Sequence, residues 1–264
     1  MTVGNPAHNR FGLSRRDLGG VKWFLLLLAA CVDTTGSALV TFHAAAAGPA
    51  DADGGPLIVG NITITRAKLH IGAVYLRLTQ PSAGSQEQPC ILPAYSYNGE
   101  VRQGLDVDLL SPDPQPFPVE GSGTADTSLV AEVWLTGGPV DASEDRTVIL
   151  DLAGTAGGKP FSASFHIGAN FALPGSPGQP GAHPICKQRI VTPIRLAPTF
   201  APAQGGTLLV RVDPRGWFSN VDFTQLPAGG AFPDGNDDQN SQNLFNAMSA
   251  TAGYAVTFAP GGSP

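Results

Sequence analysis

The pattern that most restricts the fold of this chain is a two-residue alternation of apolar and polar side chains, repeated in many short segments. It is clearest in Phe161–Ile167 (FSASFHI), where every second residue is apolar. A strand directs successive side chains to opposite faces, so this alternation predicts a strand with one buried face. Comparable segments predict further strands at Ala38–Ala46, Leu57–Leu78, Val101–Leu110, Leu129–Leu135, Thr147–Leu152, Ile190–Leu196, Thr207–Val212 and Tyr254–Phe258.

Turn-forming residues separate these segments. The chain contains 33 Gly and 24 Pro, which is high for a helical protein and typical of short strands joined by turns. Only Ser241–Ala250 (SQNLFNAMSA) spaces its apolar residues as a helix does, with Asn240 or Ser241 as its cap. We therefore predict an all-β fold, a single β-sandwich over residues 38–264 with long Pro- and Gly-rich loops and one short C-terminal helix.

Two of the predicted strand segments carry further detail. Leu57–Leu78 is long enough for two strands or one bent strand, and Gly72 within it predicts a bulge or a close approach of another backbone. Val101–Leu110 (VRQGLDVDLL) is expected to be one strand, on which Asp106 and Asp108 alternate with apolar residues.

The N-terminal segment Ser14–Cys31 (SRRDLGGVKWFLLLLAAC) has the order of a bacterial lipoprotein export signal. Basic residues precede an apolar run, Trp23–Ala30, whose last residues are small and lie directly before Cys31. An export peptidase accepts small residues there, and the Cys thiol takes up the lipid. The run is shorter than the ~20 residues of a membrane span. We expect residues 1–30 to be removed, Cys31 to be lipidated and residues 31–37 to form a tether; the alternatives are an ordinary secretory signal or a short buried segment.

The same segment bears on export and on charge. Arg15 and Arg16 resemble a twin-arginine motif, with Leu18 in place of its usual Phe, although arginine pairs also occur in general signals, so both routes stay open.

Removing residues 1–30 takes away four basic residues and one acidic residue, which changes the formal charge from −6 to −9. A nucleic-acid partner is not expected, because no basic patch remains. We expect an exported, membrane-anchored protein facing the periplasm or the cell surface.

The expected location also bears on the three cysteines of the chain. Once Cys31 carries lipid, Cys90 and Cys186 remain, both in Pro-rich loops. In an oxidising compartment an even pair predicts a disulfide between them.

Three histidines, His43, His70 and His166, fall on predicted strands of the mature chain. Imidazole suits copper and zinc, so histidines that converge from neighbouring strands would form a metal site. The alternative is that each is a solvated or hydrogen-bonded strand residue.

Asp234, Asn236 and Asp238 alternate in a polar loop, and calcium prefers oxygen ligands with such spacing. Gln239 stands where a calcium loop of this type carries Gly, and Phe245 stands where it carries its closing Glu. A polar loop that caps the next helix is therefore the preferred interpretation.

The sequence shows no motif of a metalloprotease, serine hydrolase, P-loop enzyme or dinucleotide-binding enzyme. We therefore do not expect an enzyme. A Ser–His–Asp arrangement depends on the fold rather than on the order of residues, so a hydrolase stays open as a third hypothesis.

From Phe161 onward the order of features resembles a known family. FSASFHIGANF is followed by a loop and a strand, then by GTLLVRVDPRGWFSNVDF, a short helix with Met248, and the closing YAVTF. This resembles the C-terminal half of the MbnP-like lipoproteins, a copper-binding β-sandwich family of Gram-negative cell envelopes. The segment ITITRAKLHIGAVYL also looks like the early strand pair of that family.

The resemblance implies a copper site and a partner. His166 matches the motif histidine, and Trp134 lies about where the family carries a tryptophan that becomes oxidised, although here no other aromatic residue or His is its sequence neighbour. The implied ligands are His166 with His70 or His43 and modified Trp134, and the implied partner is a di-haem peroxidase-like protein. The expected function is therefore a lipid-anchored envelope protein that binds copper; the alternative is a metal-free structural or interaction lipoprotein.

Overall fold

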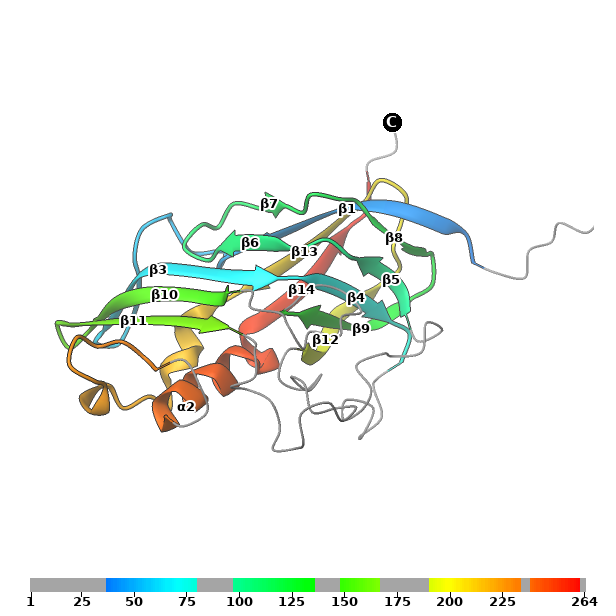
Figure 1. Ribbon diagram of the computed structural model, residues 1–264. Coiled ribbons are helices and arrows are strands. Elements are labelled where there is room, and N and C mark those ends of the chain that lie inside the picture. The colour runs from blue at the N-terminus through cyan, green and yellow to red at the C-terminus, as the bar shows by residue number, and fades with distance from the viewer. Residues whose placement is uncertain (1–36, 80–96, 136–147, 167–189, 234–237, 262–264) are drawn as a thin grey trace, which may run out of the picture. The chain divides into compact units, whose positions relative to one another are not determined.

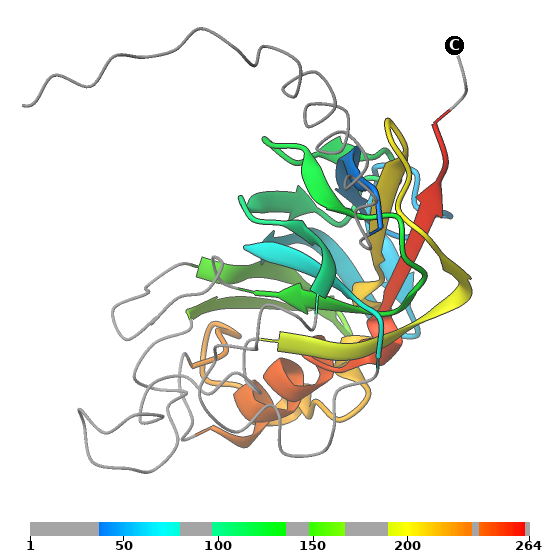
Figure 2. The same ribbon diagram turned by 90° about the vertical axis from the view of Figure 1, so that its right-hand side faces the viewer.

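The larger of two β-sheets contains nine strands in the described part of the chain. The computed structural model describes residues 37–79, 97–135, 148–166, 190–233 and 238–261. In spatial order the strands are β12 (Ile190–Phe200), β9 (Ser128–Trp134), β4 (Ala73–Arg77), β5 (Tyr97–Val101), β8 (Gly121–Thr124), β1 (Leu39–Ala47), β13 (Thr207–Val212) and β14 (Tyr254–Ala259), with β7 (Gln115–Pro116) paired to β1 (Figure 1). All pairs are antiparallel except β1 with β13. The two end strands, β12 and β14, approach each other (Figure 2), and the rings of Phe200 and Phe258 stack with centroids 5.3 Å apart, so this sheet is nearly closed.

The second sheet contains five described strands and faces the first across a shared apolar core. Its strands are β11 (Lys159–His166), β10 (Val148–Ala156), β3 (Ile62–Ile71) and β2 (Leu57–Val59), with β6 (Leu105–Asp108) paired to β3. Leu69, Leu150 and Phe165 of this sheet belong to one buried cluster with Leu76 and Val133 of the larger sheet. The predicted all-β sandwich is therefore confirmed, and Phe161, Ala163 and Phe165 are buried as their alternation predicted.

The chain passes from one sheet to the other at two glycines that lie against each other. Gly72 separates β3, in the smaller sheet, from β4, in the larger one, and Gly104 precedes β6 in the same way. A Cβ atom on Gly104 would lie 3.0 Å from the Cα atom of Gly72, so a side chain there is disfavoured. The close approach expected at Gly72 is confirmed. The single strand expected over Val101–Leu110 is wrong, because the chain leaves β5 after Val101 and enters the other sheet at Leu105.

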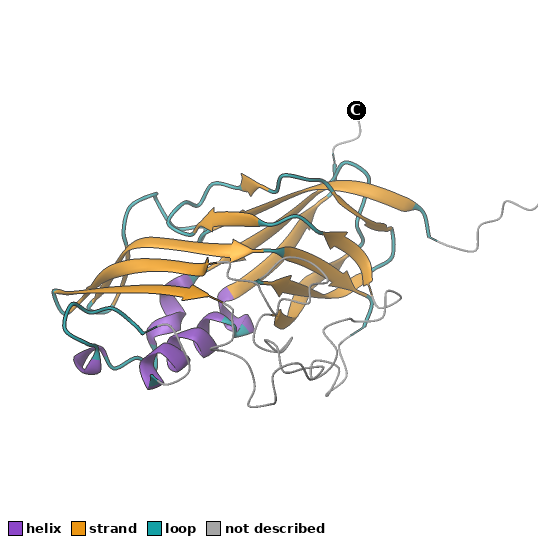
Figure 3. Ribbon diagram, in the orientation of Figure 1, coloured by secondary structure: helices purple, strands orange, loops and turns teal. Residues whose placement is uncertain are grey.

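The helical segments gather on one side of the strands (Figure 3). The helix α2 spans Gln239–Met248 and buries Leu244, Phe245 and Met248 in the core. Its cap is Asp238, whose side chain accepts a hydrogen bond from the Ser241 backbone N–H at 2.7 Å, so the expected cap at Asn240 or Ser241 is wrong. Two 3₁₀ helices, η4 (Pro214–Phe218) and η6 (Thr251–Gly253), lie in the same region, and a third, η5, spans Phe223–Gln225. Within the described ranges no helix has the length and apolar character needed to cross a membrane.

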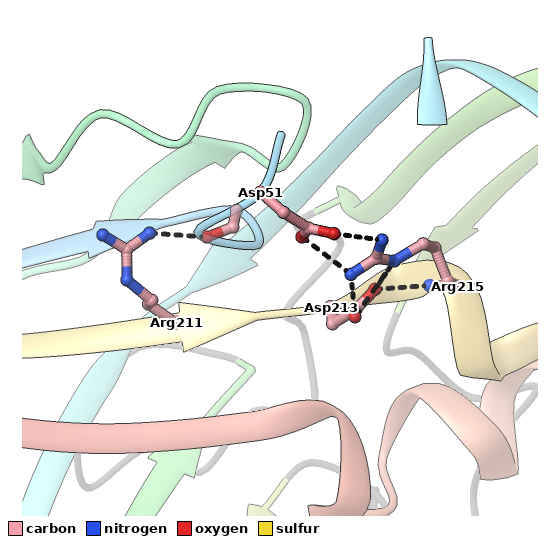
Figure 4. A network of polar contacts seen from close by, with 5 residues as sticks. Asp51, Arg211, Asp213 and Arg215 are labelled. Atoms are coloured by element: carbon pink, nitrogen blue, oxygen red, sulfur yellow. Dashed lines mark hydrogen bonds and ion pairs between the residues drawn. The ribbon is translucent and has the colours of Figure 1, made fainter. Parts of the chain in front are cut away.

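A network of charged groups fastens the segment after β1 to the start of η4 (Figure 4). The Arg215 guanidinium donates to both carboxylate oxygens of Asp51, at 2.8 and 2.9 Å, and to both of Asp213, at 2.7 to 3.1 Å. These hydrogen bonds raise the pKa of Arg215 and lower that of Asp51. Arg211 adds hydrogen bonds to the backbone carbonyls of Gly48 and Pro112. The segment after β1 is thus held by two guanidinium groups, that of Arg215 through the Asp51 carboxylate and that of Arg211 through the Gly48 carbonyl.

Candidate functional site

His70 is held in one orientation near the end of β3. Its Nδ1 atom lies 2.6 Å from the Asp106 Oδ1 atom on the neighbouring strand β6, and the His70 side chain is only 19 % exposed. The pairing is local, because His70 and Asp106 are direct partners in the ladder between β3 and β6. Metal-binding histidines typically hydrogen-bond a carboxylate through one ring nitrogen, which leaves the other nitrogen for the metal. His70 has this arrangement, with Nε2 as the second nitrogen.

His166 lies at the same end of the smaller sheet and on the same face. Lys68, Asp151 and Ser164 pair across β3, β10 and β11 in register, and all three are on the solvent side of the sheet. Strands β3 and β11 run in the same direction, because both are antiparallel to β10. His70 follows Lys68 by two residues and His166 follows Ser164 by two residues, so both histidines reach the next solvent-facing position. Two strand spacings, roughly 10 Å, separate their backbones. Between them β10 begins with a register shift, at which the exposed Val148 pairs with His166.

Trp134 lies near the crossing between the two sheets at Gly72, a residue close to His70 in the chain, but His43 does not. The backbone carbonyl of Trp134 accepts a hydrogen bond from the Gly72 N–H at 2.8 Å, two residues along the chain from His70. His43 is on β1, and in the larger sheet β4, β5 and β8 lie between β1 and the strand of Trp134. Its exposed ring lies 3.5 Å from Glu120. The structure therefore places His70 and His166 at one end of the smaller sheet, Trp134 on β9 of the larger sheet beside Gly72, and His43 elsewhere.

The Trp134 side chain belongs to a buried polar cluster around Glu132, on the face of the larger sheet that points away from the main core. The side chains of Glu132 and Arg77 are 1 % and 5 % exposed, and the Arg77 Nη1 atom donates to Glu132 Oε1 at 2.5 Å. Three neutral groups also donate to this carboxylate: the Tyr97 hydroxyl at 3.2 Å, the Thr192 hydroxyl at 3.3 Å and the Trp134 indole N–H at 3.4 Å. We call these five residues the Glu132 cluster.

Aromatic rings enclose the Glu132 cluster. The Tyr97 ring stacks on Tyr75 with centroids 4.5 Å apart, and Tyr75 meets Trp134 edge-on at 5.3 Å. The Arg77 guanidinium lies 5.6 Å from the Tyr97 centroid. Burial, together with the negative charge of Glu132, raises the pKa of Tyr97 well above its ordinary value. The cluster therefore holds a neutral phenol and a paired carboxylate away from water.

The expected copper ligands fit a metal site only in part. His70 and His166 share a face and offer imidazole nitrogen, which suits copper and zinc. Trp134 is 2 % exposed, and its indole N–H, which can only donate, is directed at Glu132. In the described ranges no three His, Cys, Asp or Glu side chains lie close enough together to hold a metal ion. The fit therefore rests on two histidines rather than on the full expected set.

Several other predicted residues lie outside the described ranges. They are Cys31, Cys90, Cys186, Asp234 and Asn236. The remaining residue of the expected calcium loop, Asp238, is described and uses its side chain to cap α2.

Asp106 and Glu132 are among the site residues that the sequence does not single out as functional. Asp106 alternates with apolar residues on a predicted strand, and its role depends on the pairing of β3 with β6, which local sequence does not reveal. Glu132 carried a usable signal, because it is the one charged residue within the apolar strand segment LVAEVWL. A lone charge in such a segment indicates a buried partner.

We compared the chain with protein-family models, curated proteins and solved structures, and none of these comparisons gave a match.

Proposed function

We propose that this chain is an exported, lipid-anchored β-sandwich protein of the cell envelope that binds copper through His70 and His166. The observation that carries the metal assignment is the contact between His70 Nδ1 and Asp106 Oδ1 at 2.6 Å. That contact orients the ring and leaves Nε2 for a metal on the face that His166 shares. Two imidazoles are a sufficient donor set for Cu(I), which accepts low coordination numbers.

Copper in this proposal is cargo, which the protein would capture and hand on. The lipid at Cys31 would keep the carrier at the membrane, and the smaller sheet, whose strand β3 carries His70, would supply a rigid support. The resemblance to the MbnP-like lipoproteins supports the same assignment, with His166 as the matched histidine.

Competition for Cu(I) against a coloured chelator tests the site. We expect the mature chain to bind one Cu(I), and His70→Ala and His166→Ala to lose stoichiometric binding. His43→Ala is the matched control, since His43 is also a strand histidine but lies in the other sheet, and it should bind as the wild type does. Failure of the wild type to bind Cu(I) would reject the metal site and favour the alternative, a metal-free interaction lipoprotein.

Asp106→Asn tests the orienting contact separately from the ligands. Loss of such a second partner typically weakens metal affinity by about 10- to 100-fold, so we expect weaker binding with unchanged stoichiometry. Wild-type affinity in Asp106→Asn would show that the contact does not prepare His70 for a metal.

Two further parts of the proposal have their own tests. Cys31→Ala should move the protein from the membrane fraction to the soluble fraction of an exporting host. The proposed partner, a di-haem peroxidase-like protein, would oxidise Trp134; an unmodified mass for the peptide that carries Trp134, in protein from its native source, would contradict that partner.

A further inference from the structure

A cavity of about 540 Å³ lies where η4, α2 and η6 meet, in a part of the molecule that the copper proposal does not use. Its inner lining includes Trp217, which is 1 % exposed, together with Gly253 and the half-buried Ala247. Its outer lining is polar and includes Asn220 and Asn246, which are exposed. The cavity therefore combines a small apolar floor with a polar rim.

The cavity carries no unpaired charge among the described residues that line it. Its one ionisable side chain is Asp213, and the Arg215 guanidinium already binds both oxygens of that carboxylate. No Lys or Arg is among the described lining residues. A phosphate or carboxylate ligand would find no cation there, and an ammonium ligand would have to displace Arg215. These features favour a neutral ligand.

Carboxamides dominate the polar rim, and one of them is held in place. The Asn243 side chain donates to the Asn220 backbone carbonyl at 2.7 Å and accepts from Gln239 at 2.9 Å. Asn246 lies one turn further along α2, and the Ser219 hydroxyl completes this side of the rim. A carboxamide offers both donors and acceptors, as does a sugar hydroxyl. Neighbouring carboxamides therefore match a ligand that presents adjacent hydroxyls.

The floor of the cavity also contains a buried nitrogen that makes no hydrogen bond within the described part of the chain. The Trp217 indole Nε1 atom is buried and has no hydrogen-bond partner among the described residues. A Cβ atom on Gly253 would lie 3.1 Å from this nitrogen, which is tighter than an ordinary contact, so the glycine lets the backbone approach the N–H edge closely. Gly253 itself lines the cavity.

We propose that this cavity binds a neutral saccharide, with the carboxamides of Asn243 and Asn246 contacting its hydroxyls and the half-buried Ala247 contacting a C–H face. The volume lies within the range of small-molecule sites, about 300–1,000 Å³. The proposal is independent of copper binding and of the membrane tether, because none of its residues takes part in either.

Ligand-observed saturation-transfer NMR on the mature chain tests the proposal, with cellobiose, maltose and N,N′-diacetylchitobiose as separate probes. We expect saturable binding of at least one disaccharide, and we expect Asn246→Ala to weaken it by about tenfold. Asn246 is exposed, and Ala favours a helix, so this variant should fold. Ala250→Phe, which places a ring in the cavity wall, should block binding, whereas Asn61→Ala, an exposed Asn in the turn between β2 and β3, is the matched control.

Two results would overturn the assignment. One is the absence of saturable binding by all three disaccharides at millimolar concentration. The other is binding that both Asn246→Ala and Ala250→Phe leave at wild-type affinity, since the sugar would then occupy another place.

Discussion

Glu132→Ala should be among the most destabilising single substitutions in this protein. Glu132 is 1 % exposed and is the common acceptor for Arg77, Tyr97, Thr192 and Trp134. Removing it leaves the Arg77 charge buried, and among the described residues the contact to the Tyr97 ring remains as compensation. One buried neutral donor, Trp134, and two half-buried ones, Tyr97 and Thr192, lose their acceptor at the same time.

The magnitude follows from the kinds of group left behind. Breaking a buried ion pair by removing one partner costs about 3–5 kcal/mol. An unsatisfied buried donor adds about 1–3 kcal/mol, although such costs do not sum within one cluster. We therefore expect Glu132→Ala to cost at least about 4 kcal/mol, a large share of the roughly 5–15 kcal/mol that stabilises a typical domain.

Equilibrium urea unfolding of the wild type, Glu132→Ala and the double variant Arg77→Met/Glu132→Leu measures this effect. The double variant removes both charges and keeps apolar volume, so it should be more stable than Glu132→Ala. It should still fall below the wild type, because the Tyr97 and Thr192 hydroxyls remain without their acceptor. The reasoning is refuted if Glu132→Ala costs less than about 1.5 kcal/mol, or if the double variant is less stable than the single one.

Three further predictions concern other parts of the fold. Gly48→Ala should cost about 1–3 kcal/mol or more in urea unfolding, because its Cβ would lie 2.1 Å from the Leu109 carbonyl oxygen; Gly216→Ala, with open space around its Cβ, should be near neutral, and equal costs for the two would contradict this. Asp238→Ala should cost about 0.5–2 kcal/mol by the same assay through loss of the α2 cap, whereas an unchanged midpoint would show that the cap contributes nothing. The hydrogen bond from Arg215 lowers the pKa of Asp51 in the folded state, so its stabilising effect is present above the unfolded pKa of about 3.9 and is lost as the pH falls through the lower folded value. The stability difference between wild type and Asp51→Asn should therefore be constant near neutral pH and narrow in acid, and a difference that does not change with pH would contradict the assignment.

The positions of strands such as β13 and β11 can be predicted because the alternation of apolar and polar side chains in the sequence matches the alternation of buried and exposed side chains in the fold. Thr207–Val212 is predicted and observed with the same bounds, and β11 buries the three described residues that its pattern assigned to the core, Phe161, Ala163 and Phe165. The spacing of Leu244, Phe245 and Met248 likewise predicts the face of α2 that is buried. In each case the repeat of apolar residues, every second residue in a strand or on one face of a helix, determines which side chains are buried. The prediction therefore does not depend on which element packs against the segment.

The errors arise where the outcome depends on a distant segment. Val101–Leu110 reads as one strand, but Gly104 meets Gly72 from another part of the chain, and the strand divides between the sheets. The next segment, residues 111–118 (SPDPQPFP), has four prolines, a composition typical of a loop, yet Gln115 and Pro116 pair with β1. The candidate metal site shows the same limit, since the partner of His70 is set by strand pairing and not by sequence distance.

The crossing at Gly72 and Gly104 has a mechanical consequence. Because β3 continues into β4, and β5 into β6, a single antiparallel ribbon belongs to both sheets. Neither sheet can slide, twist or unzip without shifting the register of the other, so the two should open together as one cooperative unit in hydrogen exchange. His70 and the Glu132 cluster lie on either side of this crossing. We therefore expect a ligand that displaces one of them to shift the other through the shared ribbon.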